Sequence, residues 1–417
     1  MSPVSTGIFE RLESEVRTYC RTYPTVFDTA NNARQRDVGG REFIDFFGGA
    51  GVLNYGHNNA RMRQAMIDYM MADGVAHSLD FYTRAKAEFM TRFEEVILKP
   101  RALDYKLQFP APTGTNVVEA ALKLARKATG RMDVIAFTNG FHGMSLGALA
   151  CTGNAHFRDA AGVPLDHVLR VPYDGFAGEG RNSLDVLERE LDDASSGIAP
   201  PAAFIVETIQ AEGGVNVASR EWLQSLQKLA RKHGSLLIVD DIQVGNGRTG
   251  RFFSFEDHGI EPDLVCLAKG IGGYGTPLGL LLIRPEYDMW KPGEHTGTFR
   301  GQDLSFVAGA EALNYYKTPD FLDAVRGKGE GVKAKLESIA ARKEGIRLRG
   351  RGMIYGLDFG SGERAAKVIK AAFETGLLIG GCGTDGRVLK FMSPLTIEDD
   401  TLSEGLDLLE QAVREAA

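Results

Sequence analysis

Glu207, Asp240 and Lys269 each stand directly after a short apolar run of this chain. The runs that they follow are Ala203–Val206, Leu236–Val239 and Leu264–Ala268. When such runs form the strands of an open α/β sheet, ligands bind in the crevice beyond the carboxyl ends of the strands. A single charge there can equally mark where a strand reaches solvent, but three charges followed by glycine-rich sequence predict one shared site.

Lys269 is the most informative of the three because a glycine-rich stretch comes directly after it. The stretch Gly270–Gly275 contains four glycines, which let the backbone approach a ligand closely. A lysine amine in a partly desolvated pocket loses proton affinity and can form a Schiff base with an aldehyde cofactor. The alternative is a G-x-G-x-x-G dinucleotide loop, which has to lie between a strand and a helix. Here Thr276-Pro277 and another apolar run come next, so the context argues against that alternative.

A candidate phosphate site precedes the helix that we predict over residues 117–128. Asn116 and Glu119 have the spacing of a capping box, with Asn in place of the usual Ser or Thr. The backbone N–H groups of Gly114, Thr115 and Asn116 would then point outward at the positive end of the helix dipole, where a phosphate binds. Alone, such a string more often forms only an ordinary helix cap.

Phe141 and His142 follow the apolar run Val134–Phe137 and are predicted to lie at the same edge of the sheet. An aromatic ring there can cover a planar cofactor or can simply belong to the core. The eight histidines show no spacing typical of a metal site. A phosphate site, a Schiff-base lysine, an acid able to face a pyridine nitrogen and an aromatic cover together describe a site for pyridoxal phosphate.

The order of the predicted elements favours an α/β protein with a mostly parallel sheet. Between residues 56 and 317, helical patterns alternate with short runs that are apolar at every position, as strands covered by helices on both faces require. After residue 317 the pattern changes to helix, strand, helix, two strands and helix. We therefore predict an N-terminal segment (1–55) packed on a small C-terminal α+β domain (318–417), with a large cofactor-binding domain (56–317) between them in the chain.

Composition argues against several other classes of protein. The formal net charge is −7 over 417 residues and no basic run is present, so nucleic-acid binding is not expected. The four cysteines lie far apart and form no C-x-x-C pair, which predicts a reducing, cytoplasmic location. No apolar stretch is long enough to cross a membrane, and no secretory signal is visible.

One long motif resembles the signature of the class III (omega-amino-acid) aminotransferases. It consists of Val239–Glu256, Gly259–Asp263 and Leu267–Gly270, and the resemblance extends over essentially the whole chain. The resemblance implies pyridoxal 5'-phosphate as cofactor. It also implies the fold-type I architecture of pyridoxal phosphate-dependent transferases, with a mostly parallel seven-stranded sheet in the large domain and a smaller α+β domain.

The resemblance also implies roles for individual residues. Lys269 is expected to form the Schiff base with the cofactor and to move a proton later in the reaction. Asp240 would pair with the pyridine nitrogen, and Gln243 would bind the phenolic oxygen. Phe141 would stack on the cofactor ring, with His142 beside it.

The remaining implied contacts involve the phosphate and a second subunit. Gly114, Thr115 and Asn116 would hold the phosphate, and Glu207 is assigned to the same cofactor site. Thr298 would reach that phosphate from a neighbouring subunit. This implies a homodimer with shared active sites and leaves a tetramer open.

Several other stretches are similar to the diaminobutyrate aminotransferases within this family. They are Leu53–His57, Ile97–Lys106, Pro112–Asn116, Phe137–Gly143 and Gly297–Gly301. That resemblance implies transfer of an amino group from L-glutamate to L-aspartate 4-semialdehyde, as in ectoine biosynthesis, by ping-pong half-reactions. Tyr55, Glu212 and Lys390 are the implied substrate contacts, and Lys390 stands where many members of the family have a carboxylate-clamping arginine.

Three alternatives remain open on the residues alone. Another class III omega-aminotransferase, acting in a different diamine or natural-product pathway, would carry the same motifs. A pyridoxal phosphate aminomutase, decarboxylase or lyase on the same fold would differ by turning over without a 2-oxo acid. A binding protein without activity would be expected to lack the Schiff-base lysine, and Lys269 is present.

Overall fold

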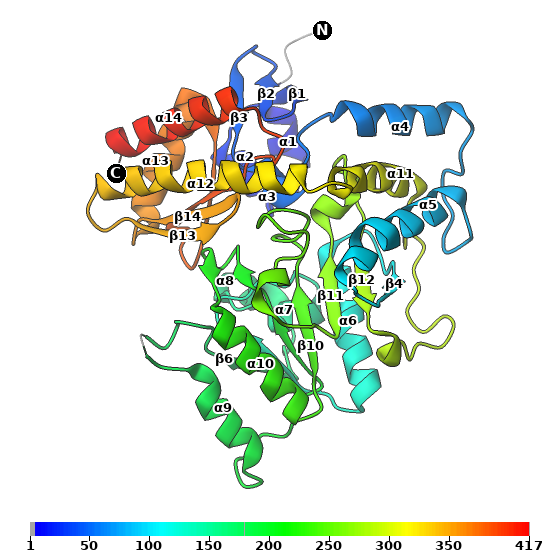
Figure 1. Ribbon diagram of the computed structural model, residues 1–417. Helices are drawn as coiled ribbons and strands as arrows, with labels where there is room; N and C mark the ends of the chain where they lie inside the picture. Colours follow the sequence, from blue (N-terminus) through cyan, green and yellow to red (C-terminus); the bar gives the residue numbers. More distant parts are fainter. Residues whose placement is uncertain (1–4, 179, 417) are drawn as a thin grey trace.

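A seven-stranded sheet forms the centre of the molecule in the computed structural model, which describes residues 5–178 and 180–416 (Figure 1). The strand order is β4-β12-β11-β10-β7-β5-β6. The strands are β4 (Lys106–Gln108), β5 (Val134–Phe137), β6 (Val168–Val171), β7 (Ala203–Val206), β10 (Leu236–Asp240), β11 (Leu264–Leu267) and β12 (Leu280–Ile283). β12 runs antiparallel to both of its neighbours, β4 and β11, and the other pairs in this sheet are parallel. The predicted α/β fold with a mostly parallel seven-stranded sheet is confirmed.

Alternate residues of the central strands enter two separate hydrophobic clusters, one on each face of the sheet. In β10, Leu237 and Val239 pack in the cluster that includes α10 (Arg220–Lys232). Ile238 points to the opposite face and packs in the cluster that includes α6 (Gly114–Thr129). Because helices cover both faces, these strands are apolar at every position, which is why continuous apolar runs predicted them.

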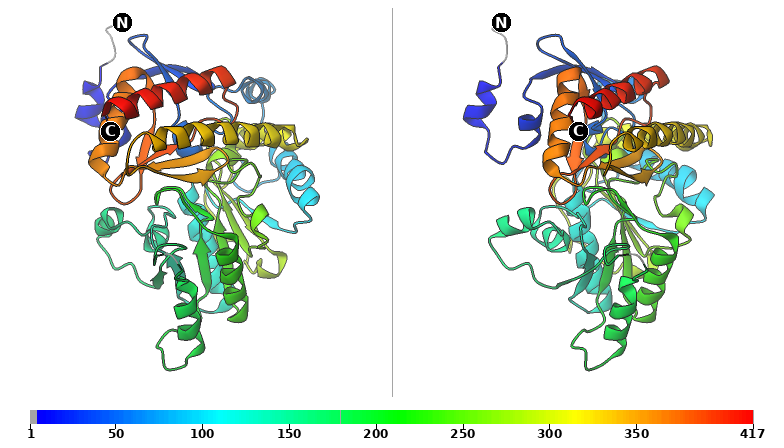
Figure 2. Two further views of the ribbon diagram at one scale, coloured as in Figure 1. Left: turned by 60° about the vertical axis from the view of Figure 1, so that its left-hand side comes forward. Right: turned by 90° about the vertical axis from the view of Figure 1, so that its left-hand side faces the viewer.

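The C-terminal part is built on a second sheet, in the order β13-β14-β17-β16. Its strands are β13 (Arg347–Arg351), β14 (Ile354–Asp358), β16 (Gly380–Cys382) and β17 (Val388–Phe391). Its helices are α12 (Asp320–Ala341), α13 (Gly362–Thr375) and α14 (Asp399–Ala416). Figure 2 shows this part, coloured yellow to red, stacked on the green central region.

A third sheet joins the two ends of the chain. Its strands are β1 (Phe27–Asn31), β2 (Arg34–Asp37), β3 (Glu42–Asp45) and β15 (Leu377–Leu378). β1, β2 and β3 form an antiparallel meander, and β15 pairs parallel with β3. The N-terminal strands therefore lie against the C-terminal part (Figure 1). The division of the chain into three domains stays a prediction.

Shorter elements complete the chain. The remaining α-helices are α1 (Gly7–Leu12), α2 (Tyr19–Thr22), α3 (Gly48–Gly51), α4 (Ala60–Met71), α5 (Arg84–Phe93), α7 (Leu146–Cys151), α8 (Ala155–Arg158), α9 (Ser183–Asp192) and α11 (Asp303–Ala312). A small hairpin, β8 (Ile209–Gln210) and β9 (Asn216–Val217), follows β7 at the carboxyl edge of the central sheet. None of the helices in the described ranges combines the length and apolar character needed to span a membrane.

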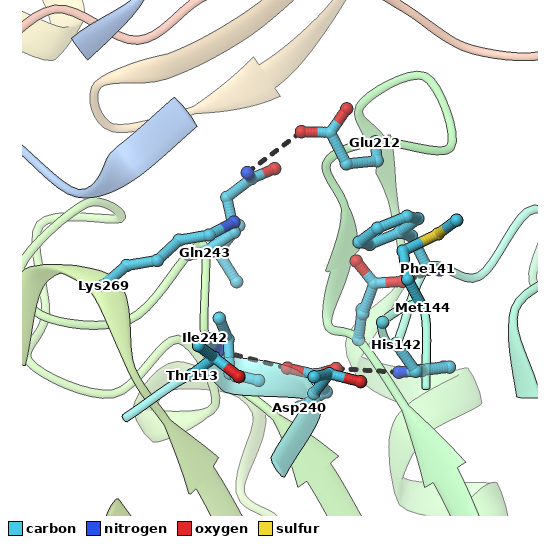
Figure 3. A pocket seen from close by; sticks show the side chains of 14 residues that line it. Thr113, Phe141, His142, Met144, Glu212, Asp240, Ile242, Gln243 and Lys269 are labelled. Atoms are coloured by element: carbon cyan, nitrogen blue, oxygen red, sulfur yellow. Dashed lines mark hydrogen bonds and ion pairs between the residues drawn. The ribbon is translucent and has the colours of Figure 1, made fainter. Parts of the chain in front are cut away.

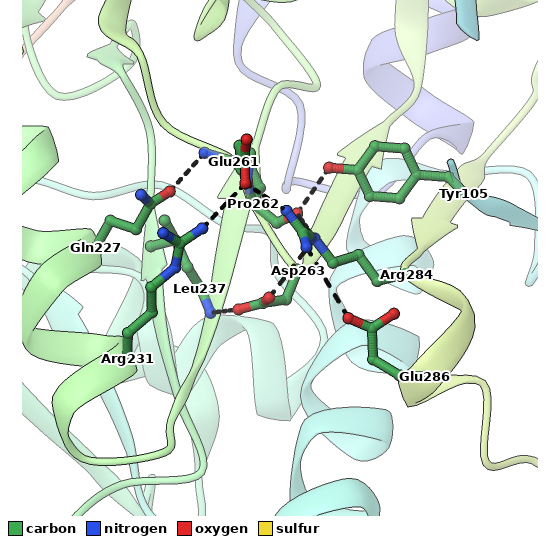
Figure 4. Close-up of polar contacts among 9 residues, drawn as sticks. All are labelled: Tyr105, Gln227, Arg231, Leu237, Glu261, Pro262, Asp263, Arg284 and Glu286. Atoms are coloured by element: carbon green, nitrogen blue, oxygen red, sulfur yellow. Dashed lines mark hydrogen bonds and ion pairs between the residues drawn. The ribbon is translucent and has the colours of Figure 1, made fainter. Parts of the chain in front are cut away.

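The amino edge of the central sheet is held by polar contacts around Asp263 (Figure 4). Asp263 precedes β11, and its Oδ2 accepts a hydrogen bond from the backbone N–H of Leu237 at 2.7 Å. Arg284, directly after β12, donates through Nη2 to Oε2 of Glu261 at 3.1 Å. These contacts tie together the ends of three strands, so the Gly259–Asp263 piece of the motif contributes to the framework and lies at the edge opposite to Lys269.

Candidate active site

A cavity of about 330 Å³ opens at the carboxyl edge of the central sheet (Figure 3). Small-molecule sites usually enclose roughly 300–1,000 Å³. Nine of the predicted site residues line this cavity: Gly114, Thr115, Phe141, His142, Glu207, Glu212, Asp240, Gln243 and Lys269. They come from the ends of four strands, the start of α6 and the β8–β9 hairpin, so the sheet brings together residues that lie far apart in the sequence.

Asp240, the last residue of β10, forms one end of the cavity together with His142 (Figure 3). Its Oδ2 lies 2.8 Å from Nδ1 of His142, and its Oδ1 accepts the backbone N–H of Ile242 at 3.2 Å. Burial opposes the charge on His142, but the hydrogen bond and the charge of Asp240 outweigh burial and raise the pKa of the imidazole. A buried carboxylate is therefore fixed in orientation by a histidine behind it.

Glu207, the residue after β7, is a second buried carboxyl group in the same wall. Its Oε1 accepts the backbone N–H of Phe141 at 2.9 Å, which fixes the loop that carries this aromatic ring. Burial raises the pKa of Glu207 well above its usual value of 4.5, and the nearby charge of Asp240 adds to this shift while that of His142 opposes it. Glu207 is therefore suited to stay protonated close to Asp240.

Lys269 lies two residues after the end of β11, and its side chain lines the cavity. Burial lowers the pKa of its amine from 10.5 to about 8; the charge of Glu212 opposes this shift and that of Lys390 reinforces it. The backbone at Lys269 has φ +54°, a left-handed conformation that favours glycine. A lysine with this pKa has an appreciable neutral fraction near pH 7 and can act as a nucleophile.

Glu212, Gln243 and Lys390 form a hydrogen-bonded group on the opposite side of the cavity from Asp240. Nζ of Lys390 contacts Oε1 of Glu212 and lies 3.2 Å from Oε1 of Gln243. Nε2 of Gln243 donates to Oε1 of Glu212 at 3.0 Å (Figure 3). Lys390 lies on β17 in the C-terminal part and is buried behind the other two residues.

The two charges of this group stabilise each other. Burial alone would raise the pKa of Glu212, but the charges of Lys390 and Lys269 lower it to about 2. Burial alone would lower the pKa of Lys390, but the adjacent Glu212 carboxylate raises it. Glu212 is thus an anion at neutral pH, and any substrate carboxylate that approaches Lys390 has to displace it or share the lysine with it.

The start of α6 differs from the predicted capping box. The helix begins at Gly114, and Asn116 lies inside its first turn, where its Oδ1 accepts a hydrogen bond from the Thr113 hydroxyl at 2.7 Å. Glu119 turns away and accepts hydrogen bonds from the Ser145 hydroxyl at 2.7 Å and from a backbone N–H of α7 at 3.0 Å. The capping-box prediction was wrong because Thr113 occupies the N-cap position.

The helix start still offers backbone donors to the cavity. Gly114 and Thr115 are the first two residues of α6, and N–H groups at these positions have no acceptor within the helix. A Cβ added at Gly114 would lie 3.0 Å from Ile242, so the glycine keeps the helix end close to the strand that carries Asp240. Asn116 does not line the cavity. A phosphate at this helix start would be held by two backbone groups and by the positive end of the helix dipole.

The structure does not bring Tyr55 or Thr298 to this cavity. Tyr55 is 2% exposed, packs in the hydrophobic core and hydrogen-bonds through its hydroxyl to that of Tyr316 at 2.7 Å. Its assignment as a substrate contact is corrected, because the only polar atom of its side chain is already hydrogen-bonded inside the core. Thr298 lies on the surface in a segment that carries the exposed ring of Phe299, so within one subunit it contacts no cofactor site.

Several lining residues were not predicted. They are Thr113, Gly143, Met144, Ile242 and Val244. Ile242 and Val244 lie on either side of Gln243 in the turn after β10, where strand alternation no longer applies, so only their closeness to Asp240 in the sequence could have indicated them. Met144 had no such signal, because an irregular loop carries it.

Comparison with known proteins gives a consistent result. Residues 18–413 match the family described as aminotransferase class-III. The chain is 50% identical over 416 residues to a protein from Halalkalibacterium halodurans named diaminobutyrate–2-oxoglutarate transaminase. The aligned region covers 99% of this chain and 97% of that protein. It is 52% identical over 419 residues to the protein of the same name from Halomonas elongata, covering 99% of this chain and all of the other.

Solved structures agree with the fold. An ornithine aminotransferase from Toxoplasma gondii, described with partial occupancy of PLP at its active site, superposes with a TM-score of 0.85 at 26% identity, covering 98% of this chain and 93% of that one. An aminotransferase from Bacillus anthracis superposes with a TM-score of 0.87 at 22% identity, covering 98% and 97% of the two chains.

Proposed function

Since this chain belongs to the class III aminotransferase family, we propose that it transfers the amino group of L-glutamate to L-aspartate 4-semialdehyde, giving L-2,4-diaminobutyrate and 2-oxoglutarate. The observation that carries this proposal is the identity of about half of all residues, over nearly the full length, to several proteins named diaminobutyrate–2-oxoglutarate transaminase.

The chain is an aminotransferase, and its cofactor is pyridoxal 5'-phosphate. The residues of the cavity fit this group. A helix start with free backbone donors suits its phosphate, Lys269 with a pKa of about 8 suits its aldehyde, and the oriented carboxylate of Asp240 suits a protonated ring nitrogen. When bound, the cofactor supplies an electron sink next to the carbon that exchanges the amine.

Residues of the protein would bind the cofactor, orient it and move protons. Gly114 and Thr115 would hold the phosphate through their N–H groups, and Phe141 would cover the ring. Asp240 would keep the ring nitrogen protonated by charge pairing, while His142 holds that carboxylate in place. The amine of Lys269 would take a proton from the carbon of the substrate that bears the amine, and its lowered pKa raises the neutral fraction able to do so.

The group formed by Glu212, Gln243 and Lys390 is our candidate for choosing between substrates. Lysine cannot make the planar two-point contact that arginine makes with a carboxylate, so Lys390 binds a carboxylate less rigidly. With the small semialdehyde bound, Glu212 would stay paired with Lys390. With glutamate bound, a substrate carboxylate would compete with Glu212 for the same ammonium group. Both half-reactions would use one site, which gives ping-pong kinetics.

Product analysis tests the proposal. The purified enzyme is incubated with 2,4-diaminobutyrate and 2-oxoglutarate, and the products are identified by mass spectrometry. Aspartate 4-semialdehyde together with glutamate supports reaction at the terminal amine. The α-keto product, or no reaction with diaminobutyrate, contradicts the proposal, and turnover without any 2-oxo acid would indicate an aminomutase or a lyase.

We further propose that the product enters ectoine biosynthesis in the cytoplasm. The similarity to the diaminobutyrate enzymes supports the pathway, and the four unpaired cysteines, three of them buried, support a reducing compartment. Deleting the gene should abolish ectoine accumulation at high salt, and added diaminobutyrate should restore it. Ectoine that persists without the gene would rule out this placement.

We also propose a homodimer in which Thr298 completes the partner's phosphate site. Large apolar side chains lie exposed at the end of α4, in the segment that follows it and beside Thr298; they are Met71, Phe81, Tyr82 and Phe299. We propose that these side chains contact the partner subunit, since contiguous exposed apolar surfaces mark interfaces. Light scattering should give about twice the chain mass of 45.3 kDa.

Subunit mixing tests the shared site. Lys269→Ala and Thr298→Asp should each be inactive as homodimers, because one lacks the amine and the other places a negative charge at the phosphate. A mixed dimer has one site with both defects and one with neither, so mixing the two should restore part of the activity. If mixing restores none while the dimers exchange subunits, Thr298 acts within its own subunit or not at all.

A further inference from the structure

Arg248 is a completely buried cation in the loop that follows β10. Its Nη1 donates to the carbonyl oxygens of Met353 at 3.1 Å and Ser393 at 2.5 Å, and its Nη2 donates to Oδ1 of Asn54 at 2.5 Å. No carboxylate is among the hydrogen-bond partners of its guanidinium in the described residues, and burial lowers its pKa to about 9. Burying a charge without an ion partner is costly, so a neutral residue would be expected here if the position only filled space.

The three acceptors belong to three different segments of the fold. Met353 lies in the turn between β13 and β14, and Ser393 lies beyond β17, three residues after Lys390. Asn54 comes from the N-terminal region that precedes α4. A planar guanidinium with donors pointing in several fixed directions can hold such acceptors at once, and a single ammonium group cannot reproduce this geometry.

Asn54 extends the connection to the nucleophile. Its Nδ2 donates to the carbonyl of Asn246 at 2.9 Å, and a Cβ added at Gly270 would lie only 2.7 Å from that Nδ2. Asn54 therefore packs directly on the residue after Lys269. One arginine side chain is thus linked through Asn54 to the nucleophile and through Ser393 to the strand that carries Lys390.

From this arrangement we propose that Arg248 is a positioning residue that sets the distance between Lys269 and the Glu212–Lys390 pair, and thereby the affinity of the site for the carboxylate of its substrate. This inference rests on the proposed transaminase function only for the identity of that substrate. Arg248 touches neither the cavity nor its lining carboxylates, so its effect has to be exerted through the segments it holds.

The test is Arg248→Lys, which keeps the positive charge and loses the planar guanidinium that donates to several acceptors. The probe is glutarate, a dicarboxylate that resembles 2-oxoglutarate but carries no group that can react. The dissociation constant of glutarate, measured by calorimetry on the holoenzyme, and the KM for 2-oxoglutarate should both rise about tenfold or more, since weakening one hydrogen bond between charged groups changes an affinity by about this factor. We expect kcat and the dissociation constant of the cofactor to change much less.

Two further variants keep the test decisive. Arg251→Lys makes the same exchange three residues away, at an exposed arginine paired with Asp257, and should leave both values unchanged. Asn54→Ala leaves Arg248 and its two carbonyl contacts in place, removes the contact with Gly270, and should also weaken glutarate binding; it carries the test if Arg248→Lys does not fold.

The contrary outcomes are distinct. A lower melting temperature with unchanged glutarate affinity and KM would show that Arg248 only stabilises the fold. Loss of cofactor affinity and kcat with unchanged KM would equally overturn the proposal. A wild-type enzyme that binds glutarate but does not convert diaminobutyrate contradicts the proposed function and leaves the comparison of glutarate affinities intact.

Discussion

Arg284 at the amino edge of the central sheet and Lys269 at the carboxyl edge have opposite environments. At the amino edge, Arg284 donates one hydrogen bond to Glu261, and this contact lowers the pKa of the carboxyl group. At the carboxyl edge, the side chain of Lys269 has no hydrogen bond or ion pair with any residue that the structure describes, and burial lowers its pKa to about 8. Paired groups are favoured in their charged forms, whereas the unpaired lysine is pushed towards its neutral, reactive form.

This contrast between the two edges shows that different parts of the class III motif serve different purposes. The Gly259–Asp263 piece sits at the amino edge and fixes strand ends, while Asp240 and Lys269 sit at the carboxyl edge and face the cavity. We therefore expect substitutions at the amino edge to change stability and substitutions at the carboxyl edge to change chemistry. Variants at both edges, compared for turnover and for stability, test that separation.

Lys269→Ala should have the largest effect. Removing the only amine that reaches the cavity from this loop should lower turnover by roughly four orders of magnitude or more, as removal of a nucleophile does in other enzymes. The variant should still bind the cofactor through the helix start, so cofactor content is measured alongside turnover. Near-normal transamination by this variant would contradict the assignment of the nucleophile.

Asp240→Asn should come next. Asparagine keeps the size of the side chain and loses the charge that favours a protonated ring nitrogen, so turnover should fall about a hundredfold or more. The matched control is Asp241→Asn, because Asp241 is buried and its Oδ2 accepts the backbone N–H of Ser254 at 3.1 Å, away from the cavity. If Asp241→Asn is the more damaging change, the acid has been assigned wrongly.

Asp263→Ala should change stability and leave chemistry intact. It removes the acceptor of the Leu237 N–H, and a buried donor left without a partner costs about 1–3 kcal/mol. Chemical denaturation of the apoenzyme measures this loss, since bound cofactor would mask part of it. A change in kcat per folded molecule larger than the change produced by Asp241→Asn would show that the two edges are not separate.

The last prediction concerns the pH at which the amine of Lys269 loses its proton, where the amino-edge variant is expected to have no effect. In the apoenzyme its amine should become reactive to an acylating reagent with a midpoint near pH 8, because its pKa is lowered from 10.5 to about 8 and the neutral amine is the nucleophile. Peptide mass spectrometry follows this lysine separately from exposed ones. Asp263→Ala should leave the midpoint where it is, and a midpoint near 10.5 in the wild-type apoenzyme would show that burial does not tune this group.

The strands could be predicted from the sequence because burial on both faces leaves a continuous apolar run. Val134–Phe137 and Ala203–Val206 coincide with β5 and β7. The residues directly after such runs are predicted by the same reasoning, since the carboxyl ends of parallel strands meet at one edge. This is why the sequence alone predicts that Glu207, Asp240 and Lys269 lie together.

Other parts of the site depend on contacts that no local pattern encodes. The histidine behind Asp240 and the lysine behind Glu212 are partners separated by 98 and 178 residues. Tyr55 was misplaced because an aromatic residue with a hydroxyl suits a substrate site and a core equally well, and only the position of Tyr316 decides between them. The true start of α6 was missed because Thr113 and Asn116 are both acceptable N-cap residues.

The left-handed backbone at Lys269 has a consequence for how this position varies. In that conformation a residue with a Cβ lowers the free energy of unfolding by roughly 1–2 kcal/mol, and glycine does not have this cost. If a library of variants is selected only for thermal stability, without selection for turnover, glycine should become enriched at position 269. Those variants should be more stable and catalytically inactive. Lysine retained at position 269 in such a library would show that the left-handed backbone there costs less stability than glycine would recover.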